Sequence, residues 1–149
     1  MKLVVSACLT GRRCRYDGNA KSTHRVLDAI AAWEADGGIV VSVCPEELGG
    51  LPTPRPPCDL HKGAGAEVWA GRAEVLGRHD KSNRTAAYLS GARHALLQSE
   101  GSTRAILKAR SPSCGCGRTW VDGQLREGDG VFAAALRQQG IELFTEENL

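Results

Sequence analysis

Short apolar runs alternate with longer amphipathic segments along this chain. The runs at 2–6, 39–43 and 104–108 ("KLVVS", "IVVSV" and "RAILK") are rich in β-branched or aliphatic residues, as in strands that are buried within a parallel sheet. Between them, apolar residues recur every three or four positions over 22–37 and 80–101, which predicts two amphipathic helices. The segment 128–147 predicts a third helix followed by a last strand.

The polar and turn-forming residues between these segments predict where the elements begin and end. Ser22 or Thr23 is placed to cap the first helix, and Gly37 with Gly38 ends it. The segment 66–78 alternates well enough to predict a hairpin with Gly71 near its turn. The proline-rich segment 45–57 is expected to be a long loop that forms a rigid, extended wall.

Strands that alternate with helices of this length predict one fold class. We expect a single domain over 1–149, built on a doubly wound, mostly parallel α/β sheet of the Rossmann-like type with a small β-hairpin insertion. The chain has 149 residues, of which 42% are hydrophobic and 24% charged, and these values are ordinary for one globular domain.

Charge and hydropathy narrow the possible partners. The formal net charge of +2 is too small to indicate nucleic-acid binding by itself. No apolar window approaches the length of a membrane span, and the apolar stretch near the N-terminus is too short for a signal peptide. We therefore expect a cytoplasmic protein with no membrane partner.

Six cysteines then need an explanation. A reducing compartment makes structural disulfides unexpected, and a single free cysteine is most often an inert core residue. Most of these six, however, lie in turns rich in Gly, Pro and Ser instead of in apolar periodic segments. Thiols in such turns are more often metal ligands or nucleophiles.

Three of the cysteines share the same position relative to a predicted strand. Cys8, Cys44 and Cys114 each lie just past the C-terminal end of an apolar run. In an open α/β sheet this edge is where ligands bind, so the three thiols are expected to converge there. Three thiolates suit zinc or an iron–sulfur cluster, and redox-active thiols are a third reading. Spacing alone does not separate these three possibilities.

Polar residues beside these cysteines add candidate chemistry. Glu46 follows Cys44 by two residues, so its carboxylate is a candidate general base next to a metal centre. The alternative is a Glu that stabilises the first turn of a short helix after Pro45. The hydroxyls of Ser111 and Ser113 could hold a substrate or satisfy the backbone of their own turn.

Four long motifs together resemble a known family. They are "VSACLTGRRCRYDG", "VCPEELGGLPTPRPP", "ILKARSPSCG" and "GDGVFAAALRQQGIELFTEE", and in this order they are similar to the bacterial thiouracil desulfidases and their relatives. The resemblance covers nearly the whole chain. It implies a [4Fe-4S] cluster that is held by three cysteines, with a fourth iron free for substrate. It also implies removal of sulfur from thiolated pyrimidines, such as 2-thiouracil to uracil plus hydrosulfide, without net redox change.

Matching the family motifs residue by residue implies a site. Cys8, Cys44 and Cys114 fall on the cluster ligands, Glu46 on the proposed base that takes a proton from water, and Ser111 on the substrate-side serine. The other cysteines are not implied to be ligands: Cys14, Cys58 and Cys116.

The expected partners are a small thiolated pyrimidine and the iron–sulfur assembly machinery that loads the cluster. Two alternatives stay open. The first is desulfuration of thiouridine in tRNA or nucleotides, which the near-neutral charge and the lack of an obvious RNA-binding domain do not favour. The second is a non-catalytic metal-binding sensor module, which predicts four protein ligands and no dependence on Glu46.

Overall fold

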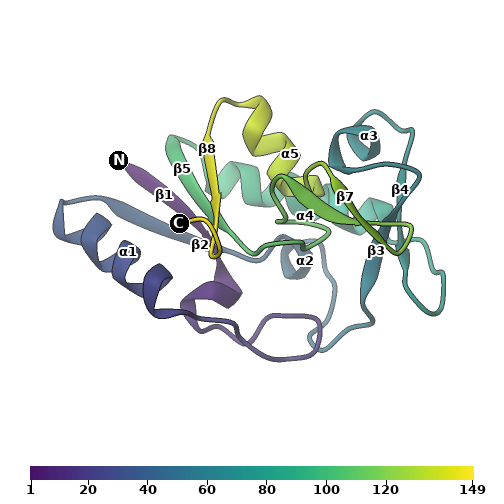
Figure 1. Cartoon of the computed structure of the whole chain (residues 1–149), viewed down its shortest axis with the longest axis horizontal. Helices are drawn as coiled ribbons and strands as arrows, with labels where there is room; N and C mark the ends of the chain where they lie inside the picture. The colour runs from purple at the N-terminus through teal and green to yellow at the C-terminus, as the bar shows by residue number, and fades with distance from the viewer.

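A four-stranded parallel sheet forms the centre of the molecule (Figure 1). The computed structural model describes all 149 residues. The strands follow the order β2-β1-β5-β8, and every neighbouring pair is parallel; they are β1 (Lys2–Ser6), β2 (Ile39–Val43), β5 (Ser102–Leu107) and β8 (Glu142–Thr145). The strands predicted at 2–6 and 39–43 are confirmed to the residue, and the one predicted at 104–108 starts two residues earlier and ends one earlier.

Helices pack against both faces of this sheet. They are α1 (His24–Ala35), α4 (Thr85–Gln98) and α5 (Val131–Gln138). Successive side chains of β1 point to opposite faces, so Val5 packs with Val26 of α1 in one core cluster. Val4 packs in the other cluster, with Phe132 of α5 and residues of α4. The middle of the sheet is therefore buried on both sides, which explains the nearly continuous apolar run of β1.

Polar side chains set the starts of the two longer helices. The Thr23 hydroxyl accepts the Val26 backbone N–H at 3.3 Å, so the predicted N-cap of α1 is confirmed. The helix α4 begins at Thr85, later than the predicted 80, because the carboxylate of Asp80 and the side-chain carbonyl of Asn83 accept nearby backbone N–H groups in turns.

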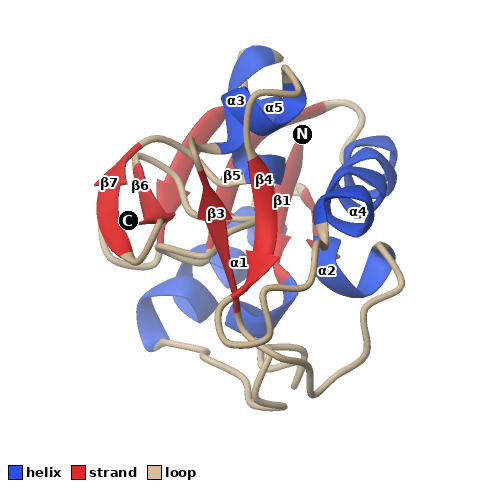
Figure 2. Ribbon diagram, turned by 90° about the vertical axis from the view of Figure 1, so that its right-hand side faces the viewer, coloured by secondary structure: helices blue, strands red, loops and turns tan.

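A second sheet stands beside the first one (Figures 1 and 2). Its order is β4-β3-β6-β7, with β3 parallel to β6 and the outer pairs antiparallel; the strands are β3 (Cys58–His61), β4 (Glu74–Gly77), β6 (Arg118–Val121) and β7 (Gln124–Glu127). Three of these strands (β3, β6 and β7) were not predicted. Cys58 is the first residue of β3.

The hairpin predicted over 66–78 is wrong in its first half. Residues Gly65–Trp69 form the helix α3, which packs against α5, where the Trp69 indole N–H donates to the carbonyl oxygen of Val131 at 2.7 Å. Only 74–77 is a strand, and its partner is β3. The hairpin that does form joins β6 to β7 through Asp122 and Gly123, which both have positive φ, as such tight turns require.

The fold is thus mixed α/β, with two sheets in a single domain. The expected class is confirmed at that level, and the doubly wound, Rossmann-like description stays a prediction. The predicted loop at 45–57 contains one short helix, α2 (Pro45–Leu48), and a 3-10 helix η1 (Ala7–Thr10) follows β1. No helix combines the length and the apolar character that a membrane crossing needs.

Candidate active site

The carboxyl edge of the parallel sheet carries the predicted thiols. Cys8 lies in η1 directly after β1, Cys44 lies between β2 and α2, and Cys114 lies in the turn that follows β5. All three line the same cavity, which has a volume of about 1110 Å³ and is also lined by residues of the second sheet. The shared position after a strand therefore brings the three cysteines to one cavity, as the sequence predicts.

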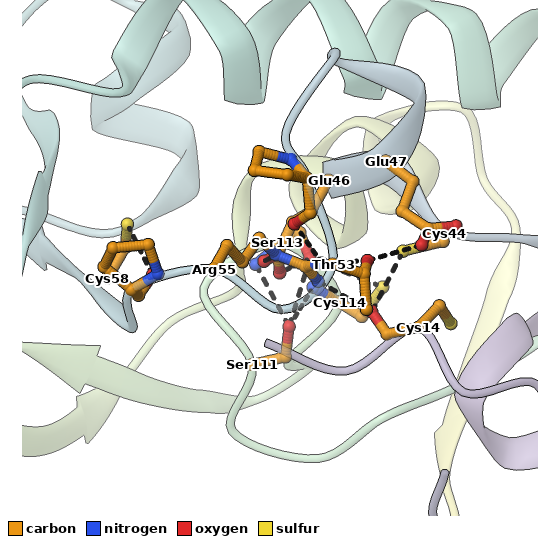
Figure 3. A network of polar contacts seen from close by, with 12 residues as sticks. Cys14, Cys44, Glu46, Glu47, Thr53, Arg55, Cys58, Ser111, Ser113 and Cys114 are labelled. Atoms are coloured by element: carbon orange, nitrogen blue, oxygen red, sulfur yellow. Dashed lines mark hydrogen bonds and ion pairs between the residues drawn. The ribbon is translucent and has the colours of Figure 1, made fainter. Parts of the chain in front are cut away.

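A fourth thiol lies among them. Cys14 is buried in the same core cluster as Cys8 and Cys44 and lines the same cavity. Its thiol lies near the thiols of both, and the Cys44 thiol donates to the carbonyl oxygen of Cys14 at 3.7 Å (Figure 3). Sequence reasoning did not place Cys14 beside the two predicted ligands.

The surroundings of Cys14, Cys44 and Cys114 raise the pKa values of their thiols. Contact with Cys14, together with burial, raises the pKa of Cys44 far above its ordinary value. The Cys44 contact lowers the pKa of Cys14, but the Cys8 contact and burial outweigh it and raise that pKa to about 11. Burial also raises the pKa of Cys114 to about 12, against the opposing hydrogen bonds of Ser6 and Ser113. Metal binding at this edge would displace the protons of these thiols.

The remaining two cysteines are in other surroundings. Cys58 lines the cavity from the start of β3, where it contacts the hydroxyl of Tyr88. Figure 3 shows it apart from Cys14 and Cys44. Cys116 is half-buried and lines a different, smaller pocket together with Asp129 and Arg137. That neither cysteine is a ligand stays a prediction.

Glu46 points into the site from the first turn of α2. Its side chain is only 12% exposed, and each carboxylate oxygen has one partner. Oε1 accepts from Nε of Arg55 at 2.8 Å, and Oε2 accepts from the hydroxyl of Ser113 at 2.8 Å. The short helix of the alternative reading exists with Glu46 in its first turn, and the carboxylate also contacts these two side chains.

The two serines of the turn after β5 differ in what they contact. The Ser111 hydroxyl accepts the backbone N–H groups of Ser113 and Cys114 at 3.2 and 3.1 Å, so it stabilises the turn. It also lies 3.1 Å from the Ser113 hydroxyl. A continuous chain of polar contacts thus leads from Ser111 through Ser113 to Glu46 (Figure 3).

Sequence reasoning missed two side chains at this site. Arg55 comes from the proline-rich segment after α2, and its guanidinium is buried against Glu46. A single cation within a run of prolines was the signal that could have identified it. Tyr88 is buried in the middle of α4; burial raises its pKa well above the ordinary value, and Glu46 and Cys58 lie close to its hydroxyl. Its place in a helix carried no such signal.

The outer part of the cavity is aromatic and charged. Tyr16 and Trp120 line it and remain partly exposed. His61 and Asp122 from the second sheet also line it, with Nδ1 of His61 at 2.5 Å from Oδ1 of Asp122, and this contact lowers the pKa of Asp122. Planar apolar groups with polar partners around them suit a flat heterocycle.

The donor chemistry at the sheet edge fits an iron–sulfur cluster. The candidate ligands are all cysteines, which such clusters bind as thiolates, and the cavity has room for a group larger than one ion. No three His, Cys, Asp or Glu side chains are grouped tightly enough to bind a single metal ion. A four-iron cluster does not need that grouping, because its ligands bind separate irons.

Comparisons with known proteins agree over nearly the whole chain. The family model described as 2-thiouracil desulfurase matches residues 3–148. A relative from Bacillus subtilis (strain 168), described as uncharacterized protein YbbK, is 34% identical over 152 residues, which cover 99% of this chain and 97% of that protein.

A solved structure gives a second comparison. The [4Fe-4S]-dependent thiouracil desulfidase TudS superposes with a TM-score of 0.81 at 39% sequence identity. The match covers 99% of this chain and 92% of that one. The similarity therefore includes both sheets and all of the segments that line the cavity.

Proposed function

Because this chain belongs to the 2-thiouracil desulfurase family, we propose that it is a [4Fe-4S]-dependent thiouracil desulfidase. The reaction adds water to a thiolated pyrimidine such as 2-thiouracil and yields uracil and hydrosulfide, with no change in oxidation state. The observation that carries the proposal is the buried Glu46 carboxylate in the same cavity as the thiols of Cys8, Cys44 and Cys114.

The three post-strand cysteines would hold the cluster. Cys8, Cys44 and Cys114 come from three separate segments, whereas Cys14 is proposed to stay free. When it is bound, the cluster supplies a Lewis acid that withdraws electrons from the carbon–sulfur bond. Loading by iron–sulfur assembly machinery belongs to this proposal as well.

The residues of the chain itself handle the water and its proton. Each carboxylate oxygen of Glu46 keeps a free lone pair beyond its hydrogen bond to Arg55 or Ser113, so it can accept a proton from water. The water oxygen bonds to the carbon as the carbon–sulfur bond breaks, and the sulfur leaves as hydrosulfide. Ser111 is proposed to face the substrate, where its contact with Ser113 connects it to Glu46.

Anaerobic sulfide release from 2-thiouracil tests the proposal. We expect purified protein to contain about four irons per chain and to release sulfide. Glu46→Gln keeps the shape and the cluster but removes the proton acceptor, so turnover should fall by about 10²–10⁴-fold at matched iron content. The matched control is Glu47→Gln in the next residue, whose carboxylate contacts Arg12 and Thr53 and should leave turnover nearly unchanged.

Two results contradict this function. Turnover like that of the wild type in Glu46→Gln rejects Glu46 as the base. A colourless protein that contains one zinc and no iron after anaerobic purification rejects the cluster.

A further inference from the structure

One buried guanidinium joins three segments of the site. The Arg55 side chain is 5% exposed, and it donates hydrogen bonds from all three nitrogens. Nε donates to Glu46 Oε1 at 2.8 Å, and Nη2 donates to the carbonyl oxygen of Cys14 at 2.8 Å. Nη1 donates to Oγ1 of Thr53 at 2.9 Å and to the carbonyl oxygen of Pro52 at 3.2 Å. Figure 3 shows Arg55 between these groups.

The backbone of Arg55 adds a further link to the loop after η1. Its N–H donates to the carbonyl oxygen of Tyr16 at 2.7 Å, so this loop is bound twice, once through the backbone and once through the guanidinium. The loop holds Cys14, the helix α2 holds Glu46, and the proline-rich segment holds Arg55 itself. These three parts of the cavity wall meet at a single side chain.

Only arginine has the geometry for these contacts. The guanidinium is planar and presents five N–H donors in fixed directions, whereas a lysine ammonium is a compact charge on a flexible stem. Glu46 is itself nearly buried, and a buried carboxylate needs a paired cation to offset the loss of water. Arg55 supplies that cation and also fixes one oxygen, which leaves the other oxygen to the hydroxyl of Ser113.

We propose that Arg55 is a positioning residue, which holds the Glu46 carboxylate in its orientation toward the cavity and fixes α2 against the Cys14 loop. The inference rests on the proposed function for its kinetic part. Arg55 acts through Glu46, so its loss should slow the chemical step and leave substrate binding and iron content largely intact.

Kinetics of Arg55→Ala and Arg55→Lys test this role, with Arg137→Ala as a control that removes a paired arginine outside the cavity. In Arg55→Ala we expect iron content like the wild type, a kcat for sulfide release from 2-thiouracil that falls at least about 10-fold, and a KM that changes less than about 3-fold. Added guanidinium ion should recover part of the lost kcat. The variant Arg55→Lys should lose less kcat than Arg55→Ala, because lysine keeps the positive charge but lacks the planar set of donors. Arg137→Ala should match the wild type.

A second measurement needs no turnover. In cluster-free protein, Arg55→Ala should lower the melting midpoint by at least about 5 °C, because it leaves the Glu46 carboxylate buried without its partner. In the double variant Arg55→Ala, Glu46→Gln, the melting midpoint should then be no lower than in Arg55→Ala, or should partly return toward the wild-type value. If Arg55→Ala does not fold, the same comparison is made with Arg55→Lys, with and without Glu46→Gln.

These measurements separate failure of the inference from failure of the function. Absence of sulfide release in the iron-loaded wild type contradicts the proposed function, and the melting comparison still decides on Arg55. If the shifts in melting midpoint caused by Arg55→Ala and Glu46→Gln simply add in the double variant, the proposed pairing of Arg55 with Glu46 is wrong. A wild-type kcat in Arg55→Ala overturns the positioning role, as does a raised KM with unchanged kcat or a loss of kcat that follows loss of iron.

Discussion

Cys114 and Cys116 are two residues apart in the chain, yet they lie in different parts of the molecule. Cys114 is buried and lines the large cavity, where the hydroxyl of Ser113 is 3.7 Å from its sulfur. Cys116 is half-buried and lines the smaller pocket with Asp129 and Arg137. Two thiols that look like one chelating pair in the sequence therefore have no pocket in common.

Gly115 explains how the turn separates them. Its N–H donates to the carbonyl oxygen of Ser111 at 2.8 Å, and its own carbonyl oxygen accepts from the N–H of Gly130 at 2.6 Å. A Cβ at this position would lie 2.7 Å from the carbonyl oxygen of Ser111, so no larger residue fits without a shift of backbone. The comparison teaches that the path of the backbone, and not the spacing of the cysteines, decides which thiol reaches the site.

Cysteine substitutions in the two regions should give the largest difference, which is a difference in iron content. Cys114→Ser is expected to lose the cluster iron completely, as are Cys8→Ser and Cys44→Ser, because each removes a proposed thiolate ligand. Cys116→Ser and Cys58→Ser should retain iron like the wild type. The measurement is iron and acid-labile sulfide per chain after anaerobic purification. Complete loss of iron in Cys116→Ser would make Cys116 a ligand as well.

Removal of one hydroxyl on the cavity side of the turn should have the next largest effect. Ser113→Ala deletes a hydrogen bond to the Glu46 carboxylate, and bonds to charged groups contribute about 1.5–3 kcal/mol, so kcat should fall roughly 10–100-fold at unchanged iron content. Ser102→Ala is the control, because the Ser102 hydroxyl is buried without a hydrogen-bond partner. Equal sulfide release by the two variants would show that the contact between Ser113 and Glu46 has no part in the reaction.

The turn itself can be strained directly. Gly115→Ala brings a methyl group against the backbone of Ser111 and Arg118, so we expect a loss of about 1–3 kcal/mol in the free energy of unfolding. Urea titration of the cluster-free protein measures it. An unchanged unfolding midpoint would mean that the turn adapts without cost, and that its geometry does not separate the two thiols.

Cys14 should give the smallest effect. Cys14→Ala is expected to keep its iron and its turnover and to lose about 1 kcal/mol of stability, because it leaves a small void in a buried cluster. Iron analysis and urea titration on one preparation measure both. Loss of all iron would make Cys14 a ligand and would require a new assignment of the three cysteines.

The central sheet could be predicted from the sequence, whereas the second sheet could not. The strand β1 is found as predicted because burial on both faces of a parallel sheet demands a continuous apolar run. The edge strand β2 is partly exposed, and its run of β-branched residues favours a strand. The strands of the second sheet have four residues each, and β7 is almost entirely exposed, so they leave little pattern to read. The segment at 66–70 alternates like a strand but forms α3, because its contacts with α5 decide its structure.

The candidate site divides in a similar way. Cys8, Cys44 and Cys114 could be placed together because their positions after strands fix the edge on which they lie. The role of Arg55 depends on the path of a loop that brings its guanidinium to Glu46, and no periodicity encodes that path. Tyr88 reaches the site only because α4 packs beside α2.

The parallel pairing of β1 with β5 also determines when the site can form during synthesis. Cys8, Cys14 and Cys44 leave the ribosome long before β5 and the turn that carries Cys114. Pairing between such distant segments comes late, because the loop between them must be ordered first. The last residues of the chain complete the arrangement, since β8 pairs with β5 and the Glu146 carboxylate accepts the N–H of Ala109 at 2.7 Å. A growing chain thus presents an incomplete set of thiols until β5 and β8 have paired, and all of them line one cavity only in the folded protein.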